Sequence, residues 1–220
     1  HGTCRRQRQM CIRDRSRGHK ADFAHFLIES GEQLLSLLWP AADARRAASL
    51  EIIARTAYTA EESACHYLET IGLDQSGAIR KTLELARRQD SNEQTHEDIF
   101  SRDLGGLSLW IDRFVARHVA VLVYWIFALT TLLDHELASL LGEAVEAEAV
   151  KTYRRMLLEQ PEEWLQQPVT PIATAYWRKE GNMWAARDEC EPKTLRDVIE
   201  LIARDELDHV AANSQKAIAF

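Results

Sequence analysis

Two Glu-x-x-His motifs, far apart in the chain, constrain its fold more than any other feature. Glu93 and His96 form the first motif, and Glu206 and His209 form the second. A spacing of three residues puts both side chains of a motif on one face of a helix, so that a carboxylate and an imidazole can bind the same metal ion. Two such helices, joined by two others that each give one glutamate, are typical of a ferritin-like di-iron protein. We therefore expect an all-α, ferritin-like four-helix bundle with a di-iron carboxylate centre.

The residues alone leave the two further glutamates open, because both remaining long helices carry several. The candidates are Glu51, Glu61, Glu62 and Glu69 in residues 42–72, and Glu143, Glu146 and Glu148 in residues 136–160. An ordinary acidic four-helix bundle that holds no metal is the alternative interpretation of the whole pattern.

Other polar residues near the motifs have expected supporting roles. Asn92 and Asp205 directly precede a motif glutamate, so they are candidates to hydrogen-bond a metal ligand, with solvated helix polarity as the alternative. His66, His118 and His135 fall in no Glu-x-x-His motif, and we expect them to be structural or surface residues.

Apolar residues recur at helical spacing along most of the chain, with Gly and Pro at the breaks. The pattern predicts helices over residues 22–39, 42–72, 78–104, 109–133 and 136–160, and from residue 194 onward. Thr194 is a plausible N-cap for the last helix. Residues 74–77 have the composition of a turn, and residues 161–193, which hold several prolines, are expected to be looser.

Composition excludes several classes of protein. A chain of 220 residues with 46% hydrophobic residues can bury the core of one domain. Its net charge of −7 gives no basic footprint for nucleic acid. The four cysteines form no close pair, which argues against a zinc ribbon and against a disulfide-stapled scaffold.

The first 20 residues differ from the rest, because they are rich in arginine and lack apolar periodicity. We expect residues 1–20 to be a disordered basic arm and residues 21–220 to be the folded domain. Residues 10–14, MCIRD, match the peptide that a common sequencing-library transposon end encodes, so the beginning of the arm is interpreted as an assembly scar. A remnant of a transit peptide is the alternative.

Residues 119–133 carry no charge and include Tyr124 and Trp125. A helix that spans a bilayer needs about 20 apolar residues, so this run is short for a span. We expect this helix, together with the helix over residues 22–39, to lie in one leaflet of a membrane without crossing it, so that one or two extra membrane-interface helices accompany the four-helix bundle. A buried core helix and a true membrane span are the alternatives.

Six segments, in order along the chain, carry a resemblance to a known family. They are LEIIARTAY (50–58), DRFVARHVAV (112–121), GEAVEAEAVKTY (142–153), PIATAYW (171–177), GNMWAARDEC (181–190) and TLRDVIELIARDELDH (194–209). They resemble LETIARVPY, DRFLAQHIAV, SECVESHAFETY, PEIAVKYY, GDLYLFDEF and LYDVFVNIRDDEAEH of the alternative oxidase family, in its plastid terminal oxidase branch. The resemblance covers the chain from about residue 43 onward, and the helix over residues 22–39 matches poorly.

The resemblance selects the two open glutamates. Glu51 stands where the family has its first glutamate ligand, and Glu146 precedes Tyr153 by seven residues, as the family's ligand does. Glu69 in a second Leu-Glu-Thr sequence is the alternative to Glu51, but it lies too close to Glu93 along the chain. The implied ligands of two iron ions are Glu51, Glu93, His96, Glu146, Glu206 and His209. Carboxylate and imidazole donors suit iron.

The resemblance also implies an activity: oxidation of quinol with reduction of dioxygen to water, without proton pumping. Tyr153 is implied as the catalytic tyrosine near the irons. Arg46, Leu50, Glu148 and Ala149 match the positions that bind quinol. On an ideal helix Arg46 is turned about 140° from Glu51, which predicts a place at the pocket rim, and Glu148 is turned about 200° from Glu146, which predicts that it faces away from the irons.

The implied partners are plastoquinol or ubiquinol, dioxygen, a membrane surface and a second copy of the chain, with no nucleic acid. We expect a thylakoid, plastid or bacterial inner membrane rather than a mitochondrial one. The alternative functions are another di-iron oxidase or hydroxylase, an iron-binding bundle without enzymatic activity, and a metal-free helical interaction module.

Overall fold

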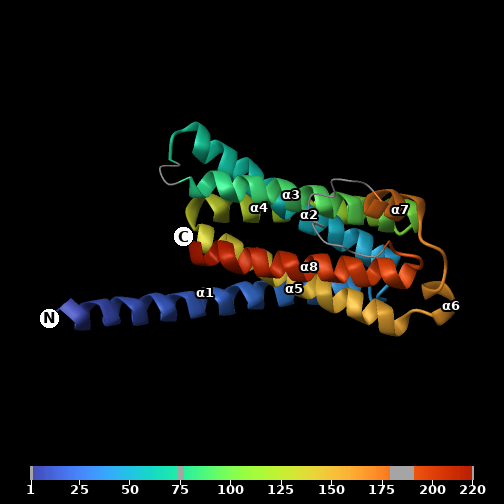
Figure 1. Cartoon of the computed structure of the whole chain (residues 1–220), viewed down its shortest axis with the longest axis horizontal. Coiled ribbons are helices and arrows are strands. Elements are labelled where there is room, and N and C mark those ends of the chain that lie inside the picture. The colour runs from blue at the N-terminus through green and yellow to red at the C-terminus, as the bar shows by residue number, and fades with distance from the viewer. Residues whose placement is uncertain (1, 74–76, 179–190, 220) are drawn as a thin grey trace.

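The computed structural model describes residues 2–73, 77–178 and 191–219 (Figure 1). The helices are α1 (Gly2–Leu38), α2 (Ala44–Thr70), α3 (Ala78–Asp98), η1 (Ile99–Asp103), α4 (Trp110–Leu133), α5 (His135–Glu159), α6 (Glu162–Leu165), α7 (Pro171–Arg178) and α8 (Leu195–Ala219). Within these residues there is no strand, and the only β-type pairing is an isolated bridge between Pro168 and Thr194. The fold is therefore all-α.

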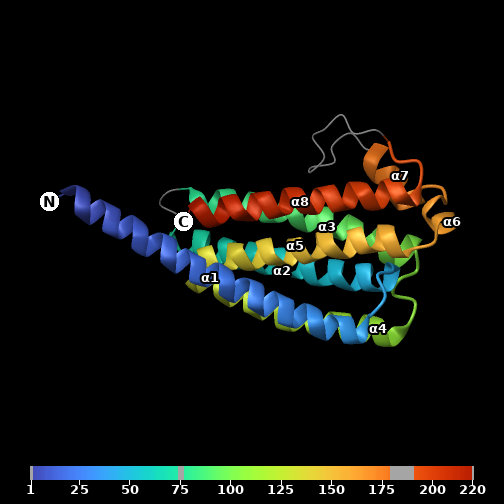
Figure 2. The same cartoon turned by 90° about the horizontal axis from the view of Figure 1, so that it is seen from below.

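Four long helices, α2, α3, α5 and α8, form the central bundle (Figure 1). α2 packs along α3, and α5 packs along α8, while contacts of α2 with α5 and of α3 with α8 close the bundle. α4 lies along α2 and α1 lies along α5, so both extra helices are on the same side of the bundle (Figure 2). The predicted four-helix bundle with two additional helices is confirmed.

Side-chain caps fix where α2 and α8 begin. Asp43 accepts hydrogen bonds from the backbone N–H groups of Arg45 and Arg46 and so caps α2. Thr194 and Asp197 cap α8 reciprocally, because the Thr194 hydroxyl accepts from the Asp197 N–H and the Asp197 carboxylate accepts from the Thr194 N–H. This is a capping box, so the predicted N-cap at Thr194 is confirmed.

The basic segment at the N-terminus, which was expected to be a disordered arm, is helical in this structure. Residues 2–20 form the first part of α1, which extends past the bundle (Figure 2). The segment contains no proline and is rich in Arg and Gln, which are good helix formers, so nothing in it interrupts the helix. Lys20 Nζ pairs with Asp134 at 2.7 Å and with Glu136 at 2.8 Å, which ties α1 to the beginning of α5.

Two other boundaries differ from the expectation. The helix predicted over residues 78–104 ends as α3 at Asp98, and its last turn is the π-helical segment η1. The stretch over residues 161–193, expected to be loose, contains the short helices α6 and α7. Residues 74–76 of the predicted turn and residues 181–190 of the family motif lie outside the described residues.

α4 is not a buried core helix, because only 28% of its most apolar window is buried. It is the one helix of the described chain that is long and apolar enough to cross a membrane, by length and composition alone. Large apolar side chains are exposed along α1 and α4, and we call this surface the α1–α4 apolar face. Its members are Phe23, Phe26, Leu34, Leu37 and Leu38 on α1, and Trp110, Ile111, Phe114, Val121, Leu122, Trp125, Leu129, Leu132 and Leu133 on α4.

Candidate metal centre

The six predicted ligands meet in the middle of the central bundle. Four helices contribute them, and each of the six is at most 2% exposed. They form two overlapping groups, and within each group the possible ligand atoms lie within 4.8 Å of one another. One group is Glu51, Glu93, His96 and Glu206, and the other is Glu93, Glu146, Glu206 and His209. We call the six residues the Glu/His cluster.

The two Glu-x-x-His motifs interlock within this cluster. The imidazole Nδ1 of His96 lies 3.1 Å from Glu206 Oε1, and Nδ1 of His209 lies 2.9 Å from Glu93 Oε1. Each histidine therefore faces the glutamate of the other motif. Glu51 Oε2 lies 3.6 Å from His96 Nδ1, on the α2 side of the cluster.

The cluster fits a pair of metal ions. All four glutamates have buried oxygens that make no hydrogen bond in the described chain, and two of these oxygens, Glu93 Oε2 and Glu146 Oε2, belong to no ion pair there either. An unpaired buried carboxylate oxygen is costly, and metal ligation is one way to compensate it. Carboxylate oxygens with two imidazoles form the donor set of ferritin-like di-iron proteins.

Burial and mutual repulsion perturb the protonation of these glutamates. Burial raises the pKa of Glu51 to about 7, and burial together with the charge of Glu206 raises the pKa values of Glu93 and Glu146 well above the usual range. Burial also opposes ionisation of Glu206, but its bonds to His209 and His96 outweigh that effect and lower its pKa. Without a cation, the cluster therefore retains protons that a metal would displace.

The second ring nitrogen of His96, Nε2, contacts the polar side chains of Asp205 and Asn92. His96 Nε2 lies 3.3 Å from Asp205 Oδ2 and 3.2 Å from Asn92 Nδ2. Asn92 Nδ2 also lies 3.2 Å from Asp205 Oδ2 and 2.5 Å from the hydroxyl of Tyr176 on α7. Burial opposes protonation of His96, but the bonds to Asp205 and to the cluster glutamates raise its pKa well above the usual value. Asn92 and Asp205 therefore do contact a predicted ligand.

Tyr58 is a site residue that the sequence analysis missed. Its hydroxyl lies 2.5 Å from Glu146 Oε1, 3.0 Å from Gln89 Nε2 and 3.1 Å from Asn213 Nδ2. Burial and the charge of Glu146 raise the pKa of Tyr58 well above its usual value, so it stays protonated. The available signal was its place seven residues, or two helical turns, after Glu51, which puts both on one face of α2.

The remaining candidates divide clearly between the interior and the surface. Tyr153 is fully buried and stacks on Phe100 with 5.5 Å between the ring centroids, and its hydroxyl has no hydrogen-bond partner in the described chain. Glu69, the alternative to Glu51, instead forms a surface ion pair with Arg80 at 2.7 Å. Among the described residues, the groups that could hold a metal ion include none of His66, His118 and His135.

The predicted quinol residues do not form an open rim. Arg46 is fully buried, which corrects the expected rim position, because α1 covers it: its guanidinium bonds Glu32, the Ser36 hydroxyl at 3.3 Å and the Trp39 carbonyl at 2.6 Å. Glu148 accepts a hydrogen bond from Lys151 Nζ at 2.5 Å. Leu50 is half-buried and Ala149 is buried.

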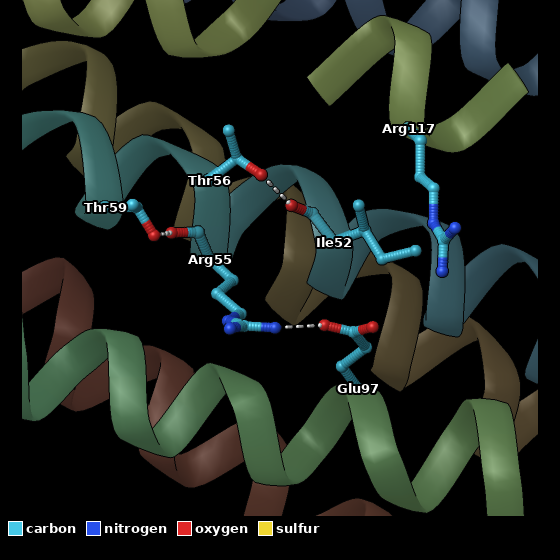
Figure 3. A pocket seen from close by; sticks show the side chains of 6 residues that line it. All are labelled: Ile52, Arg55, Thr56, Thr59, Glu97 and Arg117. Carbon is cyan, nitrogen blue, oxygen red and sulfur yellow. Dashed lines mark hydrogen bonds and ion pairs between the residues drawn. The ribbon is translucent and has the colours of Figure 1, made fainter. Parts of the chain in front are cut away.

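A separate groove lies between α2, α3 and α4 (Figure 3). It has a volume of about 300 Å3 and is lined by Ile52, Arg55, Thr56, Thr59, Glu97 and Arg117. Arg55 reaches across it to Glu97, with 3.0 Å between nitrogen and oxygen. None of the residues predicted to bind quinol lines this groove, so it gives no support to that prediction.

Comparison with known proteins agrees with the sequence motifs. The alternative oxidase family profile matches residues 30–217. The chain is 32% identical over 179 residues to a protein of Arabidopsis thaliana named ubiquinol oxidase 4, chloroplastic/chromoplastic. This match covers 80% of the chain and 49% of the relative, so the chain spans about half the length of the curated relative that it matches. The plastid-type relative agrees with the predicted branch, and the chain belongs to the alternative oxidase family.

Proposed function

We propose that this chain is a di-iron quinol oxidase, which oxidises two quinols and reduces one dioxygen to two waters without pumping protons. The observation that carries the proposal is the interlocked pair of Glu-x-x-His motifs in a member of the alternative oxidase family. The name of the Arabidopsis relative, a ubiquinol oxidase, supports the substrate class. Plastoquinol and ubiquinol both fit this class.

The six residues of the Glu/His cluster would hold the two irons. The irons, when bound, would accept electrons from quinol and pass them to dioxygen. The bundle would exclude bulk solvent from this reaction, because every ligand is buried in it. Asp205 would accept the Nε2 proton of His96, at 3.3 Å, and so keep Nδ1 turned toward the cluster.

Tyr153 is proposed as the catalytic tyrosine. Its buried hydroxyl has no hydrogen-bond partner in the described chain, so its proton is not engaged by another side chain. The stacked Phe100 ring holds the phenol in place. Such a phenol can act as a general acid that gives its proton to the oxygen being reduced, and a proton released by quinol oxidation would restore it.

The quinol head group is proposed to bind between α2 and α5, against Arg46, Leu50, Glu148 and Ala149. Arg46 offers a fork of donors, but Glu32 and Ser36 on α1 and the Trp39 carbonyl just after it now occupy these donors. Quinol entry therefore requires α1 to move or the quinol oxygen to replace Ser36, the longest of these contacts at 3.3 Å.

We further propose that the α1–α4 apolar face lies in one leaflet of a membrane. Single exposed apolar residues are ordinary on a soluble protein, but an extensive apolar surface indicates a membrane or protein partner. A thylakoid, plastid or bacterial inner membrane agrees with the chloroplastic relative. A homodimer that pairs next to this face is the proposed assembly.

Quinol-dependent oxygen uptake by the iron-loaded protein tests this function. We expect uptake that needs added quinol and that is lost in Glu93→Gln. Ala149→Trp should retain its iron but lose uptake, because the indole would fill the proposed pocket. Oxygen uptake that follows added ferrous iron but not quinol would favour an iron-binding bundle instead.

A further inference from the structure

A second buried polar group is connected to Glu146 through the Tyr58 hydroxyl. It includes an ion pair between Lys216 on α8 and Glu61 on α2, with 2.6 Å between Nζ and Oε2. Both side chains are less than a tenth exposed. Lys216 Nζ also lies 3.5 Å from Gln89 Oε1 and 5.6 Å from the centre of the Tyr58 ring.

The hydrogen bonds of this group run in one direction. An ammonium group only donates, so the amide oxygen of Gln89 must face Lys216. The amide nitrogen of Gln89 then faces the Tyr58 oxygen, at 3.0 Å, and donates to it. Asn213 Nδ2 occupies the other side of that oxygen at 3.1 Å. With both acceptor positions filled, the single phenol proton of Tyr58 points at Glu146 Oε1.

Lys216 therefore fixes the Gln89 amide in the orientation that donates to Tyr58, and so supports the direction of the Tyr58 hydrogen bond. The oxygen and nitrogen of a glutamine amide have nearly the same shape, so Gln89 could turn over if nothing fixed it. A turned Gln89 would present its oxygen to Tyr58 and compete with Glu146 for the phenol proton. The buried charge of Lys216 is compensated by Glu61, which keeps the ammonium group in place.

We propose that Lys216 is a positioning residue, which acts through Gln89 and Tyr58 to hold Glu146 Oε1 and leave Oε2 for the metal. Glu146 Oε2 has no hydrogen-bond partner in the described chain, as expected of an oxygen that a metal would take. The proposal rests on the proposed function, since it requires Glu146 to be an iron ligand. It concerns one side of the centre only, because the His96 side is held by Asp205 and Asn92.

The test compares the Mössbauer spectrum of the iron-loaded full chain with that of Lys216→Met. Met has nearly the same length but no charge, so the lysine stem is retained. We expect Lys216→Met to shift the spectrum of the iron bound by Glu146, and Tyr58→Phe to shift it in the same way. Combining the two changes should give no larger shift than Tyr58→Phe alone, because both act through one hydrogen bond. Lys81→Met, on the exposed face of α3, is the matched control and should leave the spectrum unchanged.

A second variant separates positioning from stability. Lys216→Met alone leaves the buried carboxylate of Glu61 without its ion-pair partner and should lower the melting temperature. Combining Glu61→Met with Lys216→Met removes both charges and should restore the melting temperature. The proposal requires the spectrum of this double variant to stay shifted. An unchanged spectrum in the stable double variant would overturn the positioning role while leaving the di-iron centre intact. A wild-type chain without a di-iron spectrum would overturn both the inference and the proposed function.

Discussion

His96 Nδ1 lies 3.1 Å from Glu206 Oε1, although the two residues are 110 positions apart in the chain. The reciprocal contact joins His209 Nδ1 to Glu93 Oε1 at 2.9 Å. Because each motif completes its contacts with the other, neither α3 nor α8 presents a finished metal site alone. Packing these two helices side by side is what brings the ligands together.

The first prediction separates Glu51 from its sequence alternative, Glu69. Glu51→Gln should lose at least half of the bound iron, because an amide is a much weaker ligand than a carboxylate. Glu69→Gln is the matched control: it breaks only a surface ion pair with Arg80 and should retain wild-type iron. Iron analysis of both purified variants decides the matter, and an iron loss confined to Glu69→Gln would show that the alignment of α2 is wrong.

The second prediction concerns pH and the metal-free protein. The pKa of Glu51 is raised to about 7 in the fold, against an ordinary value of 4.5, so the native state binds the proton more tightly than the unfolded state. Stability of the metal-free chain should therefore fall as pH rises from about 4.5 to 7, by on the order of 3 kcal/mol from Glu51. Denaturant unfolding at a series of pH values measures this change.

Glu51→Gln supplies the control for the pH experiment, since it removes the titrating group while keeping its shape. Its unfolding free energy should depend less on pH than that of the wild type. Bound metal should likewise reduce the pH dependence of the unfolding free energy, because the metal binds the deprotonated site and its affinity increases as pH rises. A wild-type stability that rises through this pH range would contradict the raised pKa of Glu51.

Sequence reasoning identified the helices and the Glu-x-x-His pairs because both depend on spacing within one helix. It could not select Glu51 or Glu146 without the family resemblance, since the register of α2 against α3 depends on packing between helices. The role of Tyr58 was not predicted for the same reason, because its partners Gln89 and Asn213 lie on other helices. The buried position of Arg46 depends on α1, the helix whose sequence resembles the family least.

The third prediction concerns the attachment of α4 to the bundle. Asp112 is buried and accepts hydrogen bonds from Trp39 Nε1 at 3.1 Å and from Arg45 Nη2 at 2.7 Å. Asp112→Ala should cost about 1–3 kcal/mol, because the buried indole N–H loses its acceptor. Glu159→Ala, which breaks an exposed pair with Arg155, should cost less than about 1 kcal/mol. Equal unfolding free energies in the two variants would contradict this role.

The fourth prediction tests the α1–α4 apolar face. Trp125→Glu should weaken binding to lipid vesicles at least about tenfold, because it removes a large apolar side chain and adds a charge. Leu207→Glu is the control, since Leu207 is exposed on α8, and α8 lies on the other side of the bundle from α1 and α4 (Figure 2). Cosedimentation with vesicles measures both, and release of the wild-type protein by salt alone would argue against an apolar attachment.

The Glu/His cluster is proposed to hold two irons side by side. The most direct measurement combines iron analysis with Mössbauer spectroscopy of the full chain loaded with iron. We expect two irons per chain and the spectrum of a coupled iron pair, with the pair lost in Glu206→Gln, because Glu206 belongs to both ligand groups. A folded wild-type chain that binds no iron, or only isolated single ions, would contradict this proposal.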